Sequence, residues 1–275
     1  MARFGSGSRV SLAALGGLLT TTSWAHADFP SAALPSGEDH VLPCRPTIAC
    51  TAELTPPGTF EIEAGIIGRR YPQSNRSLAT PFLLKLTLEK WVQVQLGDNG
   101  YTHATGNAVA SYFDNVVGGL KFHLADQDGI LPSVAFSAEL GVPTFAGQTG
   151  YVRAVDAFFT GYVTKDFGPL HADLNVGFNT YGIDGGPKNQ EFVALAFSMS
   201  LPPPFGIMAE GYDFSDAGAL SPHDAGFLFA MTASPEPWLM FDVGGDAGLV
   251  PSTRAYATFI GVTMIPAVFS HRHKR

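Results

Sequence analysis

Apolar and polar residues alternate in this sequence, in segments about ten residues long that recur between Phe60 and Met264. The clearest segment runs from Leu170 to Tyr181, with Leu174 and Val176 on one parity and Asn175 on the other. Strand side chains point to opposite faces with period two, so the segment predicts a strand with one apolar and one polar face. If the apolar face meets lipid, arginine should be tolerated at Asn175 but not at Leu174.

The N-terminus has the features of a secretory signal. Arg3 and Arg9 supply positive charge, Val10–Leu19 is a short apolar stretch, and Ala25-His26-Ala27 forms a small-residue cleavage site before Asp28. The apolar stretch is too short to span a bilayer as a mature anchor, and a buried N-terminal helix is the alternative. We therefore expect residues 1–27 to be a signal peptide and the mature chain to be exported.

The composition argues against nucleic acid as a partner. Without the two arginines of the signal, 14 basic residues face 24 acidic ones, a net charge of about −10. Charged residues make up only 15%, there are 31 glycines, and the mean hydropathy is +0.13. Only half of each strand must be apolar in a membrane barrel, so this modest hydropathy fits such a barrel better than a helical membrane protein.

The only two cysteines, Cys44 and Cys50, lie close together in a polar, Pro-rich leader, residues 28–57. In an exported chain this spacing predicts a short disulfide loop. A metal site with His40 is the alternative, although the spacing matches no common zinc pattern. The loop is expected to hold the leader either in the periplasm or inside the barrel mouth.

About twelve alternating segments follow the leader, an even number, as single-chain bacterial barrels have. The predicted fold is all-β, an antiparallel up-and-down transmembrane β-barrel over residues 58–265, with a basic tail at 266–275. Gly100–Ser111 is expected to be a loop on the far side of the membrane, and a bulge is expected near Gly211. The barrel predicts the lipid bilayer and the outer-membrane assembly machinery as partners, in a Gram-negative-type outer membrane.

Several segments, in this order, resemble the outer-membrane proteins of the meta-pathway phenol degradation protein type. They are Pro57–Glu63, Pro81–Lys85, Gly118–Phe122, Glu139–Thr144, Asp166–Leu170 and Asn175–Phe178. The resemblance covers most of the mature chain. It implies an outer-membrane barrel that helps small, often aromatic or apolar, compounds to cross, and it implies no catalytic residues. Such barrels usually stop at an aromatic residue, whereas here Phe269 is followed by a basic tail.

Polar residues of inward parity are the candidate lining of the lumen. Together with two aromatic residues of the same parity, they are Glu61, Glu63, Lys85, Lys121, His123, Glu139, Asp156, Phe158, Tyr162, His171, Asp173, Glu210 and Asp242. Such groups either brace the barrel or contact ions and solutes. The two lysines are each expected to pair with a carboxylate on an adjacent strand. Phe158 and Tyr162 could contact an aromatic solute, and small inward residues are expected to leave space for passage.

No recognisable motif indicates an enzyme, a metal site or a cofactor. The available serines and histidines (Ser111, Ser198, Ser200, His123 and His171) do not stand in a nucleophile elbow. The predicted function is therefore an outer-membrane channel for small, possibly aromatic or apolar, compounds. A structural barrel without transport is the main alternative, and an outer-membrane hydrolase or a soluble periplasmic β-barrel binder are weaker ones.

Overall fold

The computed structural model describes residues 31–33, 39–106, 109–142, 155–182, 186–218, 221–250 and 254–270. The expected signal peptide, residues 1–27, lies outside the described residues, as do residues 271–275 of the basic tail. No helix within the described ranges is long and apolar enough to cross a membrane.

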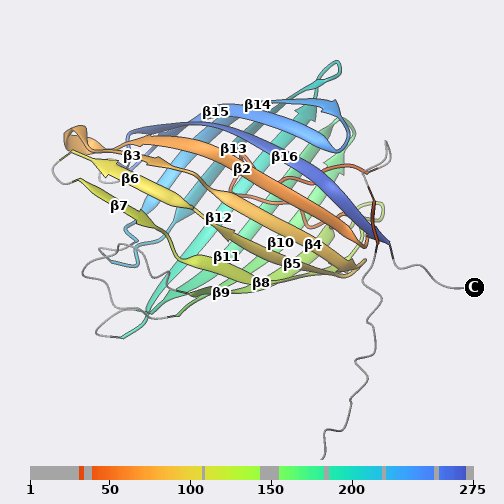
Figure 1. Cartoon of the computed structure of the whole chain (residues 1–275), viewed down its shortest axis with the longest axis horizontal. Coiled ribbons are helices and arrows are strands. Elements are labelled where there is room, and N and C mark those ends of the chain that lie inside the picture. The colour runs from red at the N-terminus through yellow and green to blue at the C-terminus, as the bar shows by residue number, and fades with distance from the viewer. Residues whose placement is uncertain are drawn as a thin grey trace, which may run out of the picture.

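Twelve strands close into one antiparallel barrel, because the last strand pairs with the first strand of the ring (Figure 1). In chain order the ring consists of β2 (Thr59–Arg70), β4 (Phe82–Glu89), β5 (Val92–Asp98), β8 (Val116–Ala125), β9 (Ser133–Val142), β10 (Asp156–Phe167), β11 (Leu170–Tyr181), β12 (Lys188–Ser200), β13 (Phe205–Phe214), β14 (Asp224–Glu236), β15 (Leu239–Gly248) and β16 (Tyr256–Ser270). The predicted antiparallel barrel of about twelve strands is confirmed.

Three further strands extend one side of the barrel: β3 (Arg76–Ala79), β6 (Tyr101–Thr105) and β7 (Ala110–Phe113). β3 pairs with β2 and β6, and β6 pairs with β7. A 3₁₀ turn, η1 (Pro72–Ser74), joins β2 to β3. The expectation of a loop over residues 100–111 is therefore wrong for most of that segment, whose β-branched and aromatic residues favour the sheet.

The final strand is longer than expected. β16 continues past Met264 to Ser270 after a register shift, and its end pairs with the short strand β1 (Ser31–Ala33). Phe269 is therefore part of the strand. The bulge expected near Gly211 is absent, since β13 pairs with both neighbouring strands without interruption. Glu210 and Tyr212 of β13 both point inward, which explains the irregular apolar pattern in its sequence.

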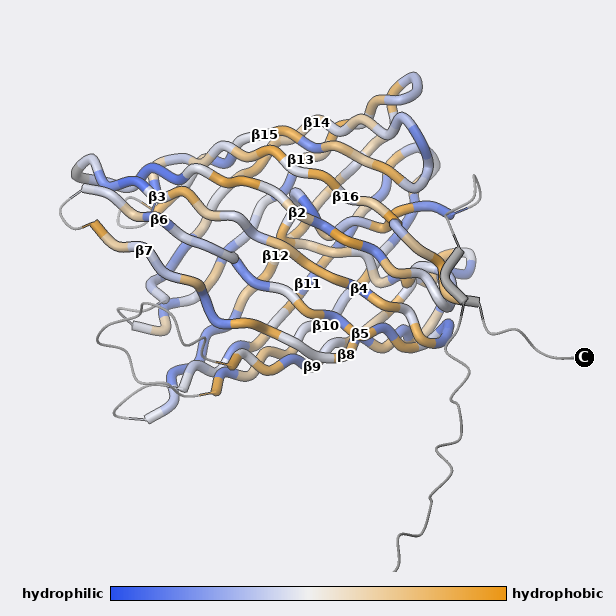
Figure 2. Tube along the Cα trace, in the orientation of Figure 1, coloured by the Kyte–Doolittle hydropathy of each residue, from blue (hydrophilic) through white to orange (hydrophobic). Residues whose placement is uncertain are grey.

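The apolar parity of the strands forms the outside of the barrel. Exposed side chains on this belt include Val176, Phe197, Phe241 and Ile260, which are 40–58% exposed, whereas Asn175 on the other parity is 1% exposed. Figure 2 shows the resulting alternation of apolar and polar residues along the strands. A soluble protein would not present such a continuous apolar band to water, but a barrel in lipid requires one.

The two ends of the barrel differ. At one end the connections are short, as between β10 and β11 (Phe167 to Leu170) and between β14 and β15 (Glu236 to Leu239), and β16 also ends there. At the other end the connections are longer, and β3, β6 and β7 project beyond the ring (Figure 1). We call these the turn end and the loop end. In outer-membrane barrels the turn end faces the periplasm and the loop end faces outward.

Candidate functional site

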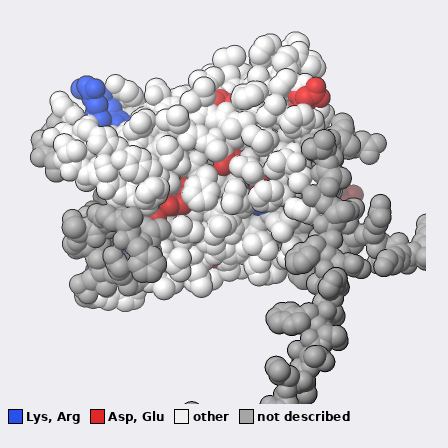
Figure 3. All heavy atoms as spheres, in the orientation of Figure 1, with Lys and Arg blue, Asp and Glu red and all other residues white. Residues whose placement is uncertain are grey.

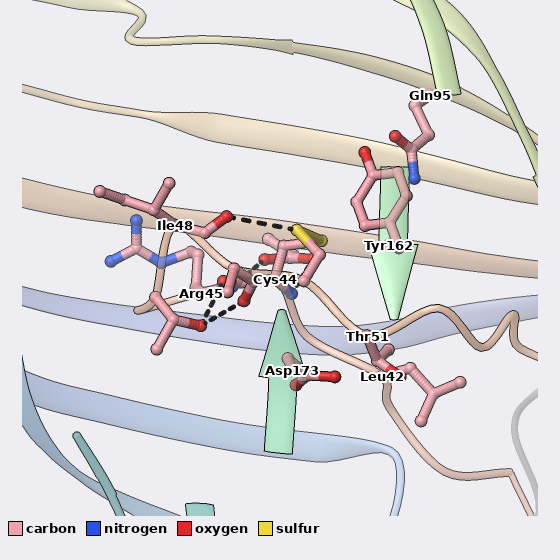
Figure 4. Close-up of a disulfide and its surroundings, with 12 residues drawn as sticks. Leu42, Cys44, Arg45, Ile48, Thr51, Gln95, Tyr162 and Asp173 are labelled. Carbon is pink, nitrogen blue, oxygen red and sulfur yellow. Dashed lines mark hydrogen bonds between the residues drawn. A yellow bond between two sulfur atoms is a disulfide. The ribbon is translucent and has the colours of Figure 1, made fainter. Parts of the chain in front are cut away.

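The lumen holds the chain segment that precedes the first strand of the ring, Asp39–Pro57, which we call the lumen segment. Its backbone is hydrogen-bonded to side chains from several strands of the wall. Cys44 and Cys50 form a disulfide within it, and Figure 4 shows this loop among wall residues. The expected disulfide is thus present in the structure, and its loop lies inside the barrel.

The first anchor of the lumen segment is a charged group on β2 and β4. Lys85 lies opposite Glu61 across the strand pair, forms ion pairs with Glu61 and Glu63, and donates to the carbonyl of Leu42 at 2.7 Å. Glu61 Oε2 accepts from the amide of Leu42 at 2.8 Å. Glu63 accepts from the amides of Cys44 and Arg45, at 2.9 and 2.8 Å. The two carboxylates are fully buried, so their charge is satisfied by Lys85 and by the backbone of the lumen segment.

The second anchor is Glu210 on β13, four strands away from β2 around the ring. Its carboxylate accepts from the amide of Ile48 at 2.8 Å and from the amide of Ala49 at 2.6 Å. Glu210 is 1% exposed, and Ala49 packs against Ala194 and Ala196 beside it. Glu210 therefore holds the tip of the disulfide loop through two charge-assisted hydrogen bonds.

The third anchor is a slot for the side chain of Arg45. Gly65 on β2 and Gly261 on β16 are direct partners across the seam that closes the barrel, and a methyl group on either would overlap the guanidinium group. Arg45 Nη2 lies 3.3 Å from Asp242 Oδ1 on β15 and donates to the carbonyl of Ile260 at 3.4 Å. The glycine pair is thus needed because a side chain of the lumen segment occupies that space.

The remaining contacts hold the stretch after the disulfide loop. Lys121 donates to the carbonyl of Thr51 and lies 4.3 Å from the ring centre of Tyr162. The amide of Ala52 donates to Thr164 Oγ1 at 2.7 Å, and its carbonyl lies 3.0 Å from Nδ1 of His123. The expected carboxylate partner of Lys85 is confirmed. The one expected for Lys121 is wrong among the described residues, because a carbonyl of the lumen segment takes its place.

The small inward residues do not leave open space. Ala135 packs against Ala52, just as Ala194 and Ala196 pack against Ala49. With its amide nitrogen turned toward the carbonyl of Cys50, Asn175 donates to it at 2.9 Å and accepts from the amide of Cys50 at 2.8 Å. Arginine at Asn175 would remove these contacts with the lumen segment. That the barrel itself tolerates arginine there stays a prediction.

The other predicted site residues lie at two levels. Near the turn end, His171 lies between Asp166 (2.7 Å) and Asp173 (3.2 Å). Toward the loop end, Asp156 accepts from the amide of Gly182 at 2.9 Å. Glu139 is half-buried beside Gly119 and is the cross-strand partner of Phe158. Phe158 packs edge-on against Tyr181, with ring centres 5.9 Å apart. The structure thus brings eight of the thirteen predicted residues against the lumen segment and leaves five around it.

A cavity of about 510 Å³ lies next to Ile48, at the tip of the disulfide loop, on the side of the loop end. Its lining residues are Ile48, Tyr71, Tyr181, Gln190, Tyr212, Phe214, Ser221, Pro222, Asp224 and Arg254. Gln190 is buried and accepts from the hydroxyl of Tyr181 at 2.9 Å. We call this cavity the vestibule. Four of its ten lining residues are aromatic, and they stand beside a few fixed polar groups, as in small-molecule sites.

Arg254, in the connection between β15 and β16, carries the positive charge of the vestibule. It forms ion pairs with Asp224 at 2.6 Å and Asp246 at 2.9 Å, and its guanidinium lies 5.2 Å from the ring centre of Tyr212. Burial lowers the pKa of Arg254 to about 10, so it stays charged at neutral pH. The hydroxyl of Tyr212 donates to Asp246 at 2.9 Å. This network fixes the aromatic wall.

The sequence did not reveal Arg45, the glycine pair Gly65 and Gly261, Thr164 or the vestibule residues as members of a site. Each depends on where the leader lies, which strand periodicity does not encode. The described residues contain no cluster of three or more His, Cys, Asp or Glu side chains able to hold a metal ion.

The class of protein follows from this geometry: a closed antiparallel β-barrel of the outer-membrane type, with its lumen filled by its own N-terminal segment. Comparison with protein-family profiles gives no match, and comparison with curated protein sequences gives none either. Among solved structures, the chain is similar to the COG4313 outer membrane channel from Pseudomonas putida F1, with 10% identity, 82% of this chain and 99% of that chain covered, and a TM-score of 0.59.

Another solved structure is more distant. The transport unit of the autotransporter AIDA-I from Escherichia coli has 12% identity and a TM-score of 0.41, with 77% of this chain and 89% of that chain covered. At such identities the likeness concerns the fold. The similarity to the channel from Pseudomonas putida F1 therefore supports the twelve-strand barrel and leaves the solute open.

Proposed function

We propose that the protein is an outer-membrane channel for small solutes, and that the lumen segment closes it at rest. The observation that carries this proposal is how the segment is held. Its backbone is bonded to Glu61, Glu63 and Glu210 and to Lys85 and Lys121, rather than packed in a large apolar core. Water can replace such polar contacts when the segment moves, so an open state is accessible at moderate cost.

The lining of the vestibule favours small aromatic or apolar compounds as the solutes of the proposed channel. Its aromatic lining lies at the loop end, where a solute arriving from outside would first meet the closed lumen. This agrees with the resemblance to the meta-pathway phenol degradation type. Tyr162, expected to offer such contact, is instead covered by Lys121 and the lumen segment, so the proposed contact shifts to Tyr181, Tyr212 and Phe214.

A barrel that serves only a structural role is the second candidate, and the filled lumen favours it. The two proposals differ in whether the lumen segment leaves the wall. Planar-bilayer recordings on refolded mature protein, together with a variant that lacks residues 39–56, test this difference. A channel predicts rare openings in the full chain and a steady conductance in the variant.

The wall that this deletion would uncover is rich in carboxylates, so the open pore should prefer cations. Uptake of a labelled small aromatic compound by cells with and without the protein tests the solute class. A full chain that never conducts, combined with unchanged uptake in cells that lack it, would leave the structural barrel as the better proposal.

A further inference from the structure

A basic groove lies on the outer face of the barrel at the loop end, away from the lumen. Its outward-facing residues come from β2, β3, β6 and β16, and they include Arg70, Arg76, His103, Tyr256 and Thr258. Ile66, Gly68 and Arg70 are alternate residues of β2, so all three face outward, and Ile66 belongs to the apolar belt. Most of the blue atoms on the face shown in Figure 3 gather at the end that carries β3.

The two arginines of this groove are direct cross-strand partners, Arg70 on β2 and Arg76 on β3. Like charges directly opposite each other on one face of a sheet are destabilising. No carboxylate of the described residues forms an ion pair with either side chain, whereas Arg45 and Arg254 both have carboxylate partners. An anion from outside the chain would relieve this repulsion.

The shape of the groove suits a phosphate group. Gly68 leaves its floor open, and the space has a volume of about 430 Å³. Guanidinium groups bind phosphate oxygens with two parallel hydrogen bonds, and the hydroxyl of Thr258 lines the same space. His103 is held beside it by Ser111, with Oγ 2.7 Å from Nδ1. The groove therefore combines two cations with hydroxyl and imidazole groups.

The surroundings of the groove point to a lipid rather than to a free anion. Leu78 and Tyr256 line it and are each 50% exposed on the outward face. Tyrosine and arginine together are typical of the level where the hydrocarbon core gives way to headgroups. We propose that this groove binds the phosphate groups of lipids in the outer leaflet around the barrel. The proposal rests on the membrane placement and orientation of the proposed function, and not on conduction.

Native mass spectrometry of the detergent-purified full chain tests this site, with lipid A that carries two phosphates as the probe. Dephosphorylated lipid A and inorganic phosphate serve as comparison ligands. The variant Arg70→Gln/Arg76→Gln should bind the phosphorylated lipid about 25-fold more weakly, from about five-fold per arginine. Arg70→Lys/Arg76→Lys should lose less, because the charge remains. Lys90→Gln, an exposed charge removed at the turn end, should bind as the wild type does.

Equal affinity of the wild type and the double glutamine variant would overturn the site. So would equal affinity for dephosphorylated lipid A. Displacement of the lipid by inorganic phosphate at equal concentration would overturn the choice of a lipid. Heat-modifiable electrophoretic mobility shows that each variant is folded. The conductance of the double glutamine variant should equal that of the wild type. Conductance thus tests the channel and lipid affinity tests the groove, so either proposal can fail without the other.

Discussion

Glu210→Ala should release the tip of the lumen segment from the wall. The change removes the acceptor of two charge-assisted hydrogen bonds, from the amides of Ile48 and Ala49. Each such bond contributes about 1.5–3 kcal/mol, and water entering from the vestibule regains part of the sum, so we expect the closed state to lose about 3 kcal/mol. An equilibrium shift of that size raises the open-to-closed ratio about 100-fold.

Single-channel recording in planar bilayers measures this ratio directly. The matched control is Asp213→Ala, which removes a carboxylate from the same strand, where Asp213 pairs with the exposed His223 and does not touch the lumen segment. The control should record like the wild type. If Glu210→Ala is folded and its open probability equals that of the control, the anchoring role of Glu210 is refuted.

Two further changes probe the wall and the belt. Gly261→Val should expel the side chain of Arg45 from its slot and raise the open probability in the same recordings, whereas Gly211→Val, with no atom near its added carbon, should leave it unchanged. Leu174→Arg should lower the free energy of unfolding by about 2–4 kcal/mol in a lipid refolding titration, whereas Asn175→Arg should mainly displace the lumen segment and increase conductance. Equal effects within either pair would contradict the assigned positions.

The strands, and the face to which each of their residues points, could be predicted because the alternation of apolar and polar residues is a local pattern. In Leu170–Tyr181 every second residue is apolar, and a strand converts that period directly into an outer and an inner face. The order of the segments then predicts an up-and-down ring. A carboxylate partner for Lys85 on an adjacent strand also followed from parity, and the register of the two strands makes Glu61 one such partner.

The contents of the lumen could not be predicted in the same way. Arg45 reaches Asp242 across 197 positions in the sequence, and nothing periodic marks that contact. The expected carboxylate partner of Lys121 was wrong because a backbone carbonyl can also accept a hydrogen bond from an ammonium group, and the sequence does not show that Thr51 lies within reach. The glycines and alanines of inward parity have the composition of an open pore, although they make room for another part of the chain.

A covalent link between the lumen segment and the wall shows whether this segment must move for the channel to open. Thr51 Oγ1 and Thr164 Oγ1 lie 3.2 Å apart, so cysteines at both positions, in a chain with Cys44→Ser and Cys50→Ser, should form a disulfide between segment and wall. Bilayer conductance is then compared before and after reduction. We expect the oxidised protein not to conduct. After reduction it should open as often as the chain that carries only Cys44→Ser and Cys50→Ser. The same conductance in both states would contradict the claim that this segment closes the channel.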